Sequence, residues 1–330
     1  IDLTSILPGK EAPFPIDCIV DSRRNRLYVS LWGRAEVVIL DPGNGHLIGS
    51  WAAEDLPGEM LLRDKGRYLY VGNANRNSVT VFDTDRGIPI ETLSAALFPE
   101  APPGSTPNAL ALSPDNRLLF ISNAGTNNVA VFDVTEPGYS KSVGFFPVGW
   151  RPNSVRVSLD GDQLLVANGM GTEPKANPGG PFPGDTRPKN LKEHIGGLFQ
   201  GMLNMIPLPD DEEAFETLMV DYTRRAYASS PLQADNLPTG QDARTPNNPI
   251  PAKLGDPSPI RYVFFVVKEN RTYDQILGDV EEGNGDPDLC LFPEVVTPNH
   301  HALAREFVLL DNFYVNGEVS RNGHEWTMGA

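Results

Sequence analysis

A short sequence unit recurs four times in the first half of the chain and limits the folds available to it. In each copy a proline stands 13 residues before an apolar or aromatic residue, and the pairs are Pro15 and Tyr28, Pro57 and Tyr70, Pro107 and Phe120, and Pro152 and Leu165. The copies start 42, 50 and 45 residues apart. A propeller blade takes about 40 to 50 residues, so these phased copies predict an all-β propeller with four visible blades.

Within one repeat the sequence alternates between strand and turn patterns. In the third copy, 109–112, 118–122 and 129–132 predict short strands, and the last of these alternates with a period of two. Residues 113–116 predict a turn, because Pro114 fixes the φ angle that its position requires. Two sets of polar residues recur near strand ends. We interpret them as turn residues, with a metal or ligand ring as the alternative: Asn73, Asn123 and Asn168, and Asp41, Asp83 and Asp133.

Charge and cysteine content exclude several classes of protein. The chain has 27 Lys+Arg against 43 Asp+Glu and a formal net charge of −16, which argues against nucleic acid as a partner. Its 2 cysteines, Cys18 and Cys290, stand far apart and exclude both a disulfide framework and a structural zinc module. No apolar run approaches the roughly 18 to 20 residues of a transmembrane helix, so we expect no transmembrane segment.

The sequence predicts three regions. Residues 1–209 are expected to form the propeller, with 169–200 as a Gly- and Pro-rich loop insertion in the fourth blade and 201–207 as its returning strand. Residues 210–257 combine an amphipathic helix, which opens with four acids, with a Pro-rich linker. Residues 258–330 form the last region. The chain begins Ile1-Asp2-Leu3, so we expect a processed or trimmed product, or one whose start is missing. Closed propellers of this kind need about seven blades, so we also expect earlier blades to be missing at the N-terminus.

Polar residues follow an apolar run at the start of the last region. Residues 262–267 are continuously apolar, which predicts a strand covered on both faces, as in the parallel sheet of an α/β domain. Glu269 and Asn270 come directly after this run. Thr272 and Gln275 then predict a capping box at a helix start. Because open α/β sheets place their sites at the carboxyl ends of strands, Glu269 and Asn270 are candidate site residues.

A second set of elements repeats this pattern. Thr297-Pro298 predicts a helix start, and we expect His300 and His301 on the surface of that helix. Residues 306–313 predict a second buried strand, and 317–324 predict a short loop that presents Ser320. Two strand ends therefore point at one place. Residues 258–330 hold 5 Lys+Arg and 12 Asp+Glu, a balance that favours cations over strongly anionic polymers.

Both halves resemble known families. Residues 69–73 and 165–169, Leu-Tyr-Val-Gly-Asn and Leu-Val-Ala-Asn-Gly, resemble the repeats of bacterial YVTN-type propellers. Four segments of the last region resemble the opening of the phosphoesterase family of bacterial phospholipases C and acid phosphatases, within the alkaline-phosphatase superfamily: 268–274, 297–301, 309–313 and 317–320. The resemblance implies a multidomain chain, a propeller followed by the start of an α/β alkaline-phosphatase-like domain. It also implies a periplasmic or secreted location.

The second resemblance implies a site and an activity. It makes Glu269 and Asn270 ligands of a divalent metal, with zinc, manganese and calcium all open, and Ser320 the phosphoryl-accepting nucleophile. His324 would contact the phosphoryl group or protonate the leaving group. Asp311 would support the site without binding the metal. The expected enzyme is a phosphoric ester hydrolase acting on small phosphoesters or phospholipid headgroups, with the propeller as a binding or gating module.

Two alternatives stay open. Asn270 could serve as a helix cap and Ser320 as a loop hydroxyl, in which case the chain would be a non-catalytic, propeller-based surface or binding protein. The family also completes its site with acidic residues and often a histidine far downstream, whereas this chain ends at Ala330. We therefore expect only part of the phosphoesterase domain and half of its site. The sequence does not indicate the propeller ligand or the oligomeric state.

Overall fold

The computed structural model describes residues 2–7, 12–99, 101–172, 195–230, 249, 257–311, 320, 323–324 and 327. The chain divides into two compact units, Ile1–Thr239 and Gly240–Ala330, and each has its own internal packing. Over the described ranges, every helix is too short or too polar to cross a lipid bilayer.

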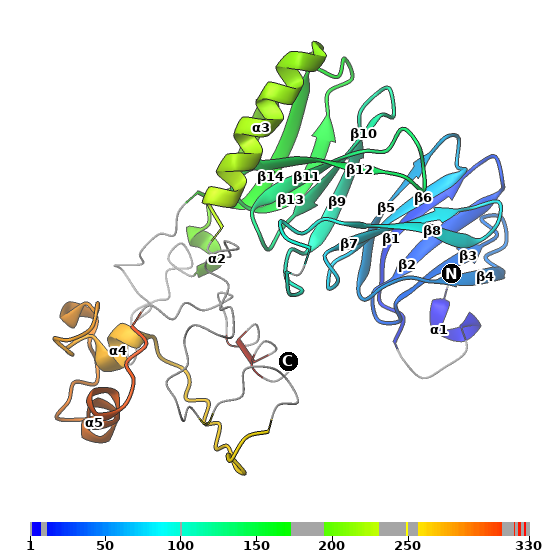
Figure 1. Cartoon of the computed structure of the whole chain (residues 1–330). Coiled ribbons are helices and arrows are strands. Elements are labelled where there is room, and N and C mark those ends of the chain that lie inside the picture. Colours follow the sequence, from blue (N-terminus) through cyan, green and yellow to red (C-terminus); the bar gives the residue numbers. More distant parts are fainter. Residues whose placement is uncertain are drawn as a thin grey trace. The chain divides into compact units, whose positions relative to one another are not determined.

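Within its described part, the first unit contains four antiparallel sheets that follow one another along the chain (Figure 1). Blade one is β1 (Pro15–Asp21), β2 (Arg26–Leu31), β3 (Glu36–Leu40) and β4 (Leu47–Ala52). Blade two is β5 (Pro57–Arg63), β6 (Tyr68–Asn73), β7 (Ser78–Asp83) and β8 (Ile88–Ser94). Blade three is β9 (Pro107–Leu112), β10 (Leu118–Asn123), β11 (Asn128–Asp133) and β12 (Lys141–Pro147). Blade four is β13 (Trp150–Val157), β14 (Gln163–Gly171) and β15 (Met202–Pro207).

Successive blades pack face to face, and this packing forms the core. The first strands lie beside one another, β1 next to β5, β5 next to β9, and β9 next to β13. The aromatic residues of the repeat fill the spaces between blades: Tyr28, Tyr70 and Phe120 are all 0% exposed. Burying a side chain of this size stabilises a fold by about 1.5–3 kcal/mol. The predicted all-β propeller blades are confirmed.

The recurring aspartates and asparagines have different roles. Asp41, Asp83 and Asp133 cap turns as predicted: Asp41 Oδ1 accepts from Gly43 N at 2.7 Å, and Asp133 Oδ1 accepts from Thr135 N at 2.9 Å. The prediction for Asn73, Asn123 and Asn168 was wrong, because all three are buried in the second strand of a blade; Asn73 and Asn123 end their strands, and Asn168 lies within β14.

Each buried asparagine joins its own strand to the neighbouring strand of the same blade. The Nδ2 atom of Asn73 donates to Thr80 Oγ1 at 2.9 Å, and that of Asn123 donates to Asn128 Oδ1 at 2.8 Å. Asn168 Nδ2 donates to an atom of β15, Asn204 Oδ1, at 2.8 Å. A buried amide must find partners, so these contacts fix the lateral position of the strands.

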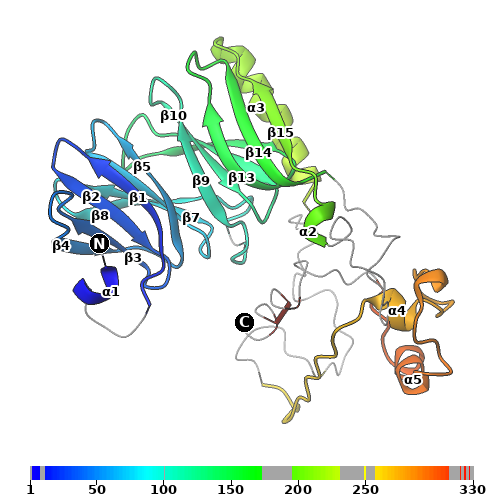
Figure 2. The ribbon, with the colours of Figure 1, turned by 180° about the vertical axis from the view of Figure 1, so that it is seen from behind.

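Helix α3 (Glu212–Ala228) lies in the region where the sequence predicts an amphipathic helix, and it packs on β12, the outer strand of blade three. Figure 2 shows it alongside the strands of blades three and four. Asp211 caps the helix by accepting from Ala214 N at 2.8 Å. Met219 and Ala226 are its buried residues. Residues 173–194 of the predicted loop insertion lie outside the described residues, and α2 (Ile195–Leu198) precedes β15.

Contacts in the C-terminal half of α3 connect it to the blades. Tyr227 Oη donates to Leu97 O at 2.6 Å, next to blade two. Thr223 Oγ1 accepts from Phe145 N at 2.9 Å, beside Gly144 in β12. Gly144 has φ +149°, and a Cβ at this position would overlap Thr223 Oγ1. A glycine is therefore required where the helix touches the strand.

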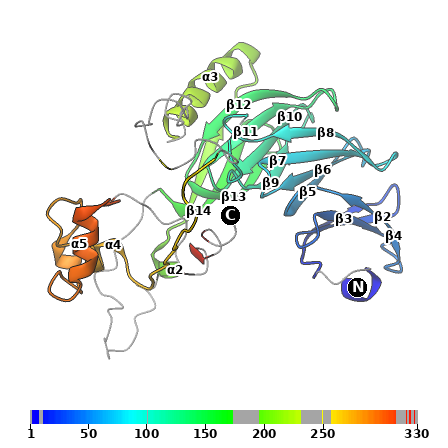
Figure 3. The same ribbon diagram turned by 60° about the horizontal axis from the view of Figure 1, so that its bottom comes forward.

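The outer face of blade one is covered by the N-terminal segment. Helix α1 (Leu3–Ile6) and the following Leu7 pack against Val29, Leu31 and neighbouring apolar residues of blade one. Figure 3 shows α1 beside this blade. Leu7 is 7% exposed, so this short segment shields part of an apolar sheet face from water.

The described part of the second unit contains helices but no strand: α4 (Tyr273–Leu277), a 3₁₀ turn η2 (Pro287–Leu289) and α5 (Pro298–Glu306). The helix starts agree with the sequence, since Thr272 and Thr297 are the N-cap residues of α4 and α5.

Both predicted buried strands of the second unit were wrong over their described residues. Phe264 is 92% exposed and Phe307 is 70% exposed, and neither run pairs in a sheet. An apolar run favours a strand, but a strand forms only where a partner accepts its backbone hydrogen bonds. Residues 312–313 and most of the predicted loop 317–324 lie outside the described residues.

Candidate functional site

The four predicted site residues of the second unit lie in two contacting pairs. His324 Nε2 lies 2.5 Å from Glu269 Oε2, and Ser320 Oγ donates to Asn270 Oδ1 at 3.3 Å. The Glu269 and His324 side chains are 50% and 47% exposed. The fold thus brings together residues that are 50 or more positions apart in the sequence, and both pairs remain open to solvent.

Basic residues flank this cluster. Lys268 Nζ contacts His300 Nε2, and the Arg271 guanidinium lies 5.4 Å from the centre of the Phe292 ring. His300 is on the helix surface as predicted, whereas the prediction for His301 was wrong: its side chain is 0% exposed. Asp311 Oδ2 accepts from Asn284 N at 2.8 Å, so its carboxylate supports a loop.

Over the described residues, this cluster supplies too few donors to hold a metal ion by itself. Glu269 and Asn270 supply one carboxylate and one amide, and Glu269 is already bonded to His324. Over the described ranges, no three His, Cys, Asp or Glu residues converge in a way that could hold an ion. Two protein ligands rarely fix a metal, so the predicted metal stays a prediction.

A second group of polar residues lies on the first strands of the propeller blades. Asp17 Oδ2 in β1 accepts from Met60 N in β5 at 2.8 Å. In the same way, Glu59 Oε2 in β5 accepts from Leu110 N in β9 at 3.1 Å. A first strand has a free edge, and its amides need acceptors. Each carboxylate therefore satisfies an edge amide of the following blade.

Arg156 adds a cation to the second of these contacts. It lies on β13, and its Nη2 is 3.2 Å from Glu59 Oε1 across the intervening strand β9. The Arg156 side chain is 59% exposed and that of Glu59 26% exposed. Burial raises the pKa of Glu59 above its ordinary 4.5, while Arg156 and the Leu110 amide act in the opposite direction. A partly desolvated carboxylate beside an accessible guanidinium is able to exchange protons and bind anionic groups.

The pair of Glu59 and Arg156 was not predicted from the sequence. The repeat carried a signal for half of it, because Asp17 and Glu59 both stand two residues after the phased proline of their blades. The third and fourth copies have Ala109 and Ser154 at this position. Arg156 follows no repeat pattern, and only the packing of β13 beside β9 places it near Glu59.

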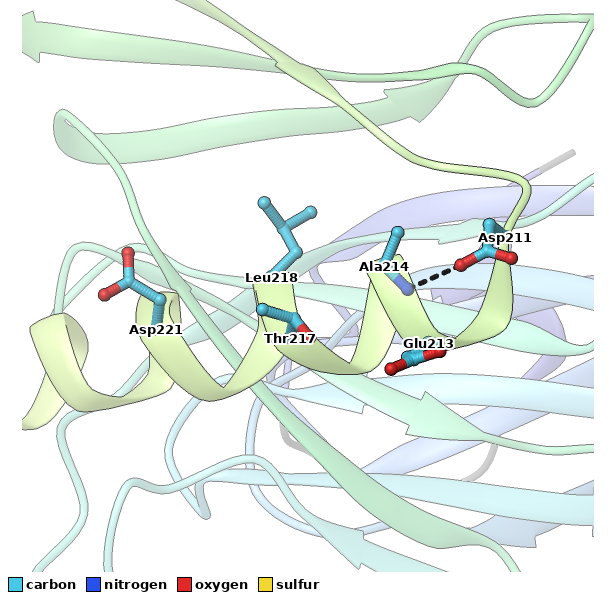
Figure 4. Close-up of a pocket in the computed structure, with 6 residues that line it drawn as sticks. All are labelled: Asp211, Glu213, Ala214, Thr217, Leu218 and Asp221. Atoms are coloured by element: carbon cyan, nitrogen blue, oxygen red, sulfur yellow. Dashed lines mark hydrogen bonds between the residues drawn. The ribbon is translucent and has the colours of Figure 1, made fainter.

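A hollow on the surface of α3 is lined by Asp211, Glu213, Ala214, Thr217, Leu218 and Asp221 (Figure 4). Two of its three acids already have structural partners. Asp211 caps the helix, and Asp221 lies 2.7 Å from both Arg224 and Arg225. This hollow therefore carries no functional assignment.

The chain is similar to known proteins over its propeller. Residues 52–172 match the family described as "Lactonase, 7-bladed beta-propeller". One similar solved structure is the hydrazine synthase of Kuenenia stuttgartiensis, with 23% sequence identity and a TM-score of 0.42 over 49% of this chain and 44% of that chain. Another is a putative 6-phosphogluconolactonase from Bacteroides fragilis, with 22% sequence identity and a TM-score of 0.41 over 49% of this chain and 50% of that chain. The chain spans about half the length of these structures. No curated protein matches it.

The match corrects the expected activity. The matched family is a lactonase-type propeller, so the expectation of metal-dependent phosphoester hydrolysis was wrong. The second unit gives no support for a fused phosphoesterase, since neither predicted strand forms among its described residues. The match agrees with the predicted propeller blades, and Glu59 and Arg156 both lie inside the matched range.

Proposed function

We propose that the chain carries a lactonase-type hydrolase, which opens cyclic carboxylic esters, and that Glu59 and Arg156 form its reaction site. One observation carries this proposal: the 3.2 Å contact between Glu59 and Arg156 on the first strands of the blades, within the matched segment. It joins a carboxylate whose pKa is raised by burial to a guanidinium that solvent and ligands can reach.

The chemistry assigns one role to each side chain. The Glu59 carboxylate takes a proton from water while the water oxygen bonds to the lactone carbonyl carbon. Negative charge then develops on the carbonyl oxygen, and the Arg156 guanidinium is placed to stabilise it. When the ring C–O bond breaks, the departing oxygen takes the proton from Glu59. The product is the open hydroxy acid, and the Glu59 carboxylate is restored.

The backbone contacts hold both groups in position. Glu59 Oε2 is fixed by Leu110 N, so Oε1 is directed toward Arg156. Arg156 Nη1 donates to Val155 O at 2.6 Å, which restricts the guanidinium without covering it. Because burial raises the pKa of Glu59, we expect the acid limb of the rate profile above pH 4.5, with activity rising as the carboxylate forms.

The test is hydrolysis of a panel of five- and six-membered lactones by the purified chain, followed as acid release at constant pH. Glu59→Gln keeps an acceptor for Leu110 N but removes the base, and we expect kcat to fall about 100-fold or more. Asp17→Asn is the matched control, because Asp17 makes the equivalent contact to Met60 N and, among the described residues, forms no ion pair with an arginine.

The two variants separate catalysis from structure. Undiminished lactone hydrolysis in Glu59→Gln would overturn the assignment, and so would equal losses in both variants, which would indicate a shared structural role. Absence of hydrolysis by the unmodified chain across the whole panel would favour the alternative of a non-catalytic binding propeller.

The second unit carries a separate proposal. We propose that Glu269 and Asn270 contribute to a divalent cation site, with zinc, manganese or calcium as the ion, because carboxylate and amide oxygens suit such cations. Metal analysis of the purified chain and of its Glu269→Gln variant tests this. Equal metal content in the two proteins would contradict it.

A further inference from the structure

The side chain of His301 is enclosed by hydrogen-bond acceptors. It lies on α5 and is 0% exposed. Its Nε2 atom is 2.9 Å from Asp279 Oδ1, and its Nδ1 atom is 2.9 Å from Thr297 O. The Thr297 hydroxyl also lies 3.1 Å from Nδ1, but it donates to Phe292 O at 2.8 Å and therefore acts as an acceptor toward the ring.

This arrangement determines the protonation state of the ring. A neutral imidazole has one N–H and one lone pair, whereas the cation has an N–H on both nitrogens. Both nitrogens of His301 face acceptors, so only the cation satisfies them all. A neutral ring would place a lone pair against either a carboxylate or a carbonyl oxygen inside the protein, where such a mismatch is costly.

We propose that Asp279 and protonated His301 form a pH-sensitive clasp, which holds α5 against the loop after α4 and releases it when His301 loses its proton. Asp279 occupies the centre of this clasp. Its Oδ2 accepts from Glu294 N at 3.0 Å, and Cys290 Sγ donates to its Oδ1 at 3.3 Å. One carboxylate thus connects three segments of the second unit.

The surrounding charges agree with a cation at this position. Asp279 and Glu294 are the acids that face His301, and Arg305, on the same helix as His301, is paired with Glu294 at 2.6 Å. Burial lowers the pKa of His301, but the bonds to Asp279 and Thr297 outweigh it, so the net shift is upward from 6.5. The hydrogen bond from His301 lowers the pKa of Asp279 to about 2.

These shifts define the pH range of the clasp. A raised histidine pKa contributes stability that is complete below 6.5 and is lost as the pH rises through the folded-state value. A lowered aspartate pKa contributes stability that is complete above 3.8 and is lost as the pH falls through about 2. The clasp is therefore fully closed between pH 3.8 and pH 6.5 and opens as the pH rises above this range.

Opening would reach the cluster around Glu269. His300 immediately precedes His301 on α5 and contacts Lys268, which precedes Glu269 in the sequence. A helix that loosens at His301 would therefore loosen the contact at Lys268 as well.

The test is a histidine NMR titration of the full chain, which has 5 histidines. His301→Gln identifies the His301 signal, and His300→Gln is the matched control because its side chain contacts Lys268 instead of Asp279. We expect the His301 signal to titrate above 6.5 and to move down by at least about one unit in Asp279→Asn, since a carboxylate partner shifts a neighbouring group by about 1 to 3 units. His300→Gln should leave it unchanged.

Hydrogen exchange of α5 provides a second measurement on the unmodified chain. After correction for the intrinsic rate, amides in Pro298–Glu306 should lose protection as the pH rises through the His301 titration. A His301 signal that titrates at or below 6.5, or α5 protection that stays constant across the titration, would overturn the proposal. Asp279→Asn answers the question even if His301→Gln does not fold.

Discussion

The contact between α3 and β12 allows a quantitative test of how the helix is attached to the propeller. Gly144 has φ +149°, which is accessible almost only to glycine, and a Cβ there would overlap Thr223 Oγ1 and lie 3.0 Å from Met219 Cε. Backbone strain of this kind costs about 1–3 kcal/mol, and the overlap adds to it. We expect Gly144→Ala to lower the free energy of unfolding by about 3 kcal/mol.

The second arm of the test changes the helix side of the same contact. Thr223→Ala removes the acceptor for Phe145 N, which lies in the protein interior, and leaving a buried amide unpaired costs about 1–3 kcal/mol. Thr223→Ser keeps the hydroxyl and is the control, with a loss expected below about 1 kcal/mol.

A double-mutant cycle shows whether the Gly144→Ala and Thr223→Ala substitutions act through the same contact or independently. Thr223→Ala removes the atom that the new methyl group would overlap, so the double variant should be less destabilised than the sum of the single variants by at least about 1 kcal/mol. The measurement is urea unfolding followed by far-UV circular dichroism, with midpoints compared at unchanged slope. Additivity within about 0.5 kcal/mol would show that the helix does not rest on this strand as described.

Three further predictions concern buried groups. Arg63 is 7% exposed and donates to Val134 O in the next blade, so Arg63→Met should destabilise the propeller by about 1.5–3 kcal/mol in urea unfolding, and equal stability would contradict this. Asn123→Ala leaves two buried acceptors unpaired and should cost about 1–3 kcal/mol; an unchanged unfolding midpoint would argue against its bridging role. Burial raises the pKa of Cys290 above 9.0, so iodoacetamide at pH 8 should modify the exposed Cys18 first, as mass spectrometry of peptides can show; equal rates would disprove it.

The propeller was predictable because its information is local and repeated. The phased prolines mark the first strands, and β1, β5 and β9 begin at Pro15, Pro57 and Pro107. The turn aspartates act on amides two or three residues away, so their role follows from the sequence. Helix starts are equally local, as Thr272 and Thr297 demonstrate.

The errors arose where the outcome depends on distant partners. Residues 262–267 have the composition of a buried strand, but composition cannot supply the neighbouring strand that would pair with them. His301 resembles a surface residue in the sequence, because its burial depends on Asp279, 22 positions away. Glu59 and Arg156 are 97 positions apart and share no motif, so only the packing of three blades reveals their contact.

The carboxylates at the inner edge give the propeller a direction. Asp17 of blade one accepts from an amide of blade two, and Glu59 of blade two accepts from an amide of blade three, so in both contacts the dependence runs toward the C-terminus. Loss of one acid would therefore expose an amide in the following sheet and leave the preceding one intact. In the Asp17→Ala variant, the Met60 amide, one blade downstream of the substitution, should therefore exchange its hydrogen faster.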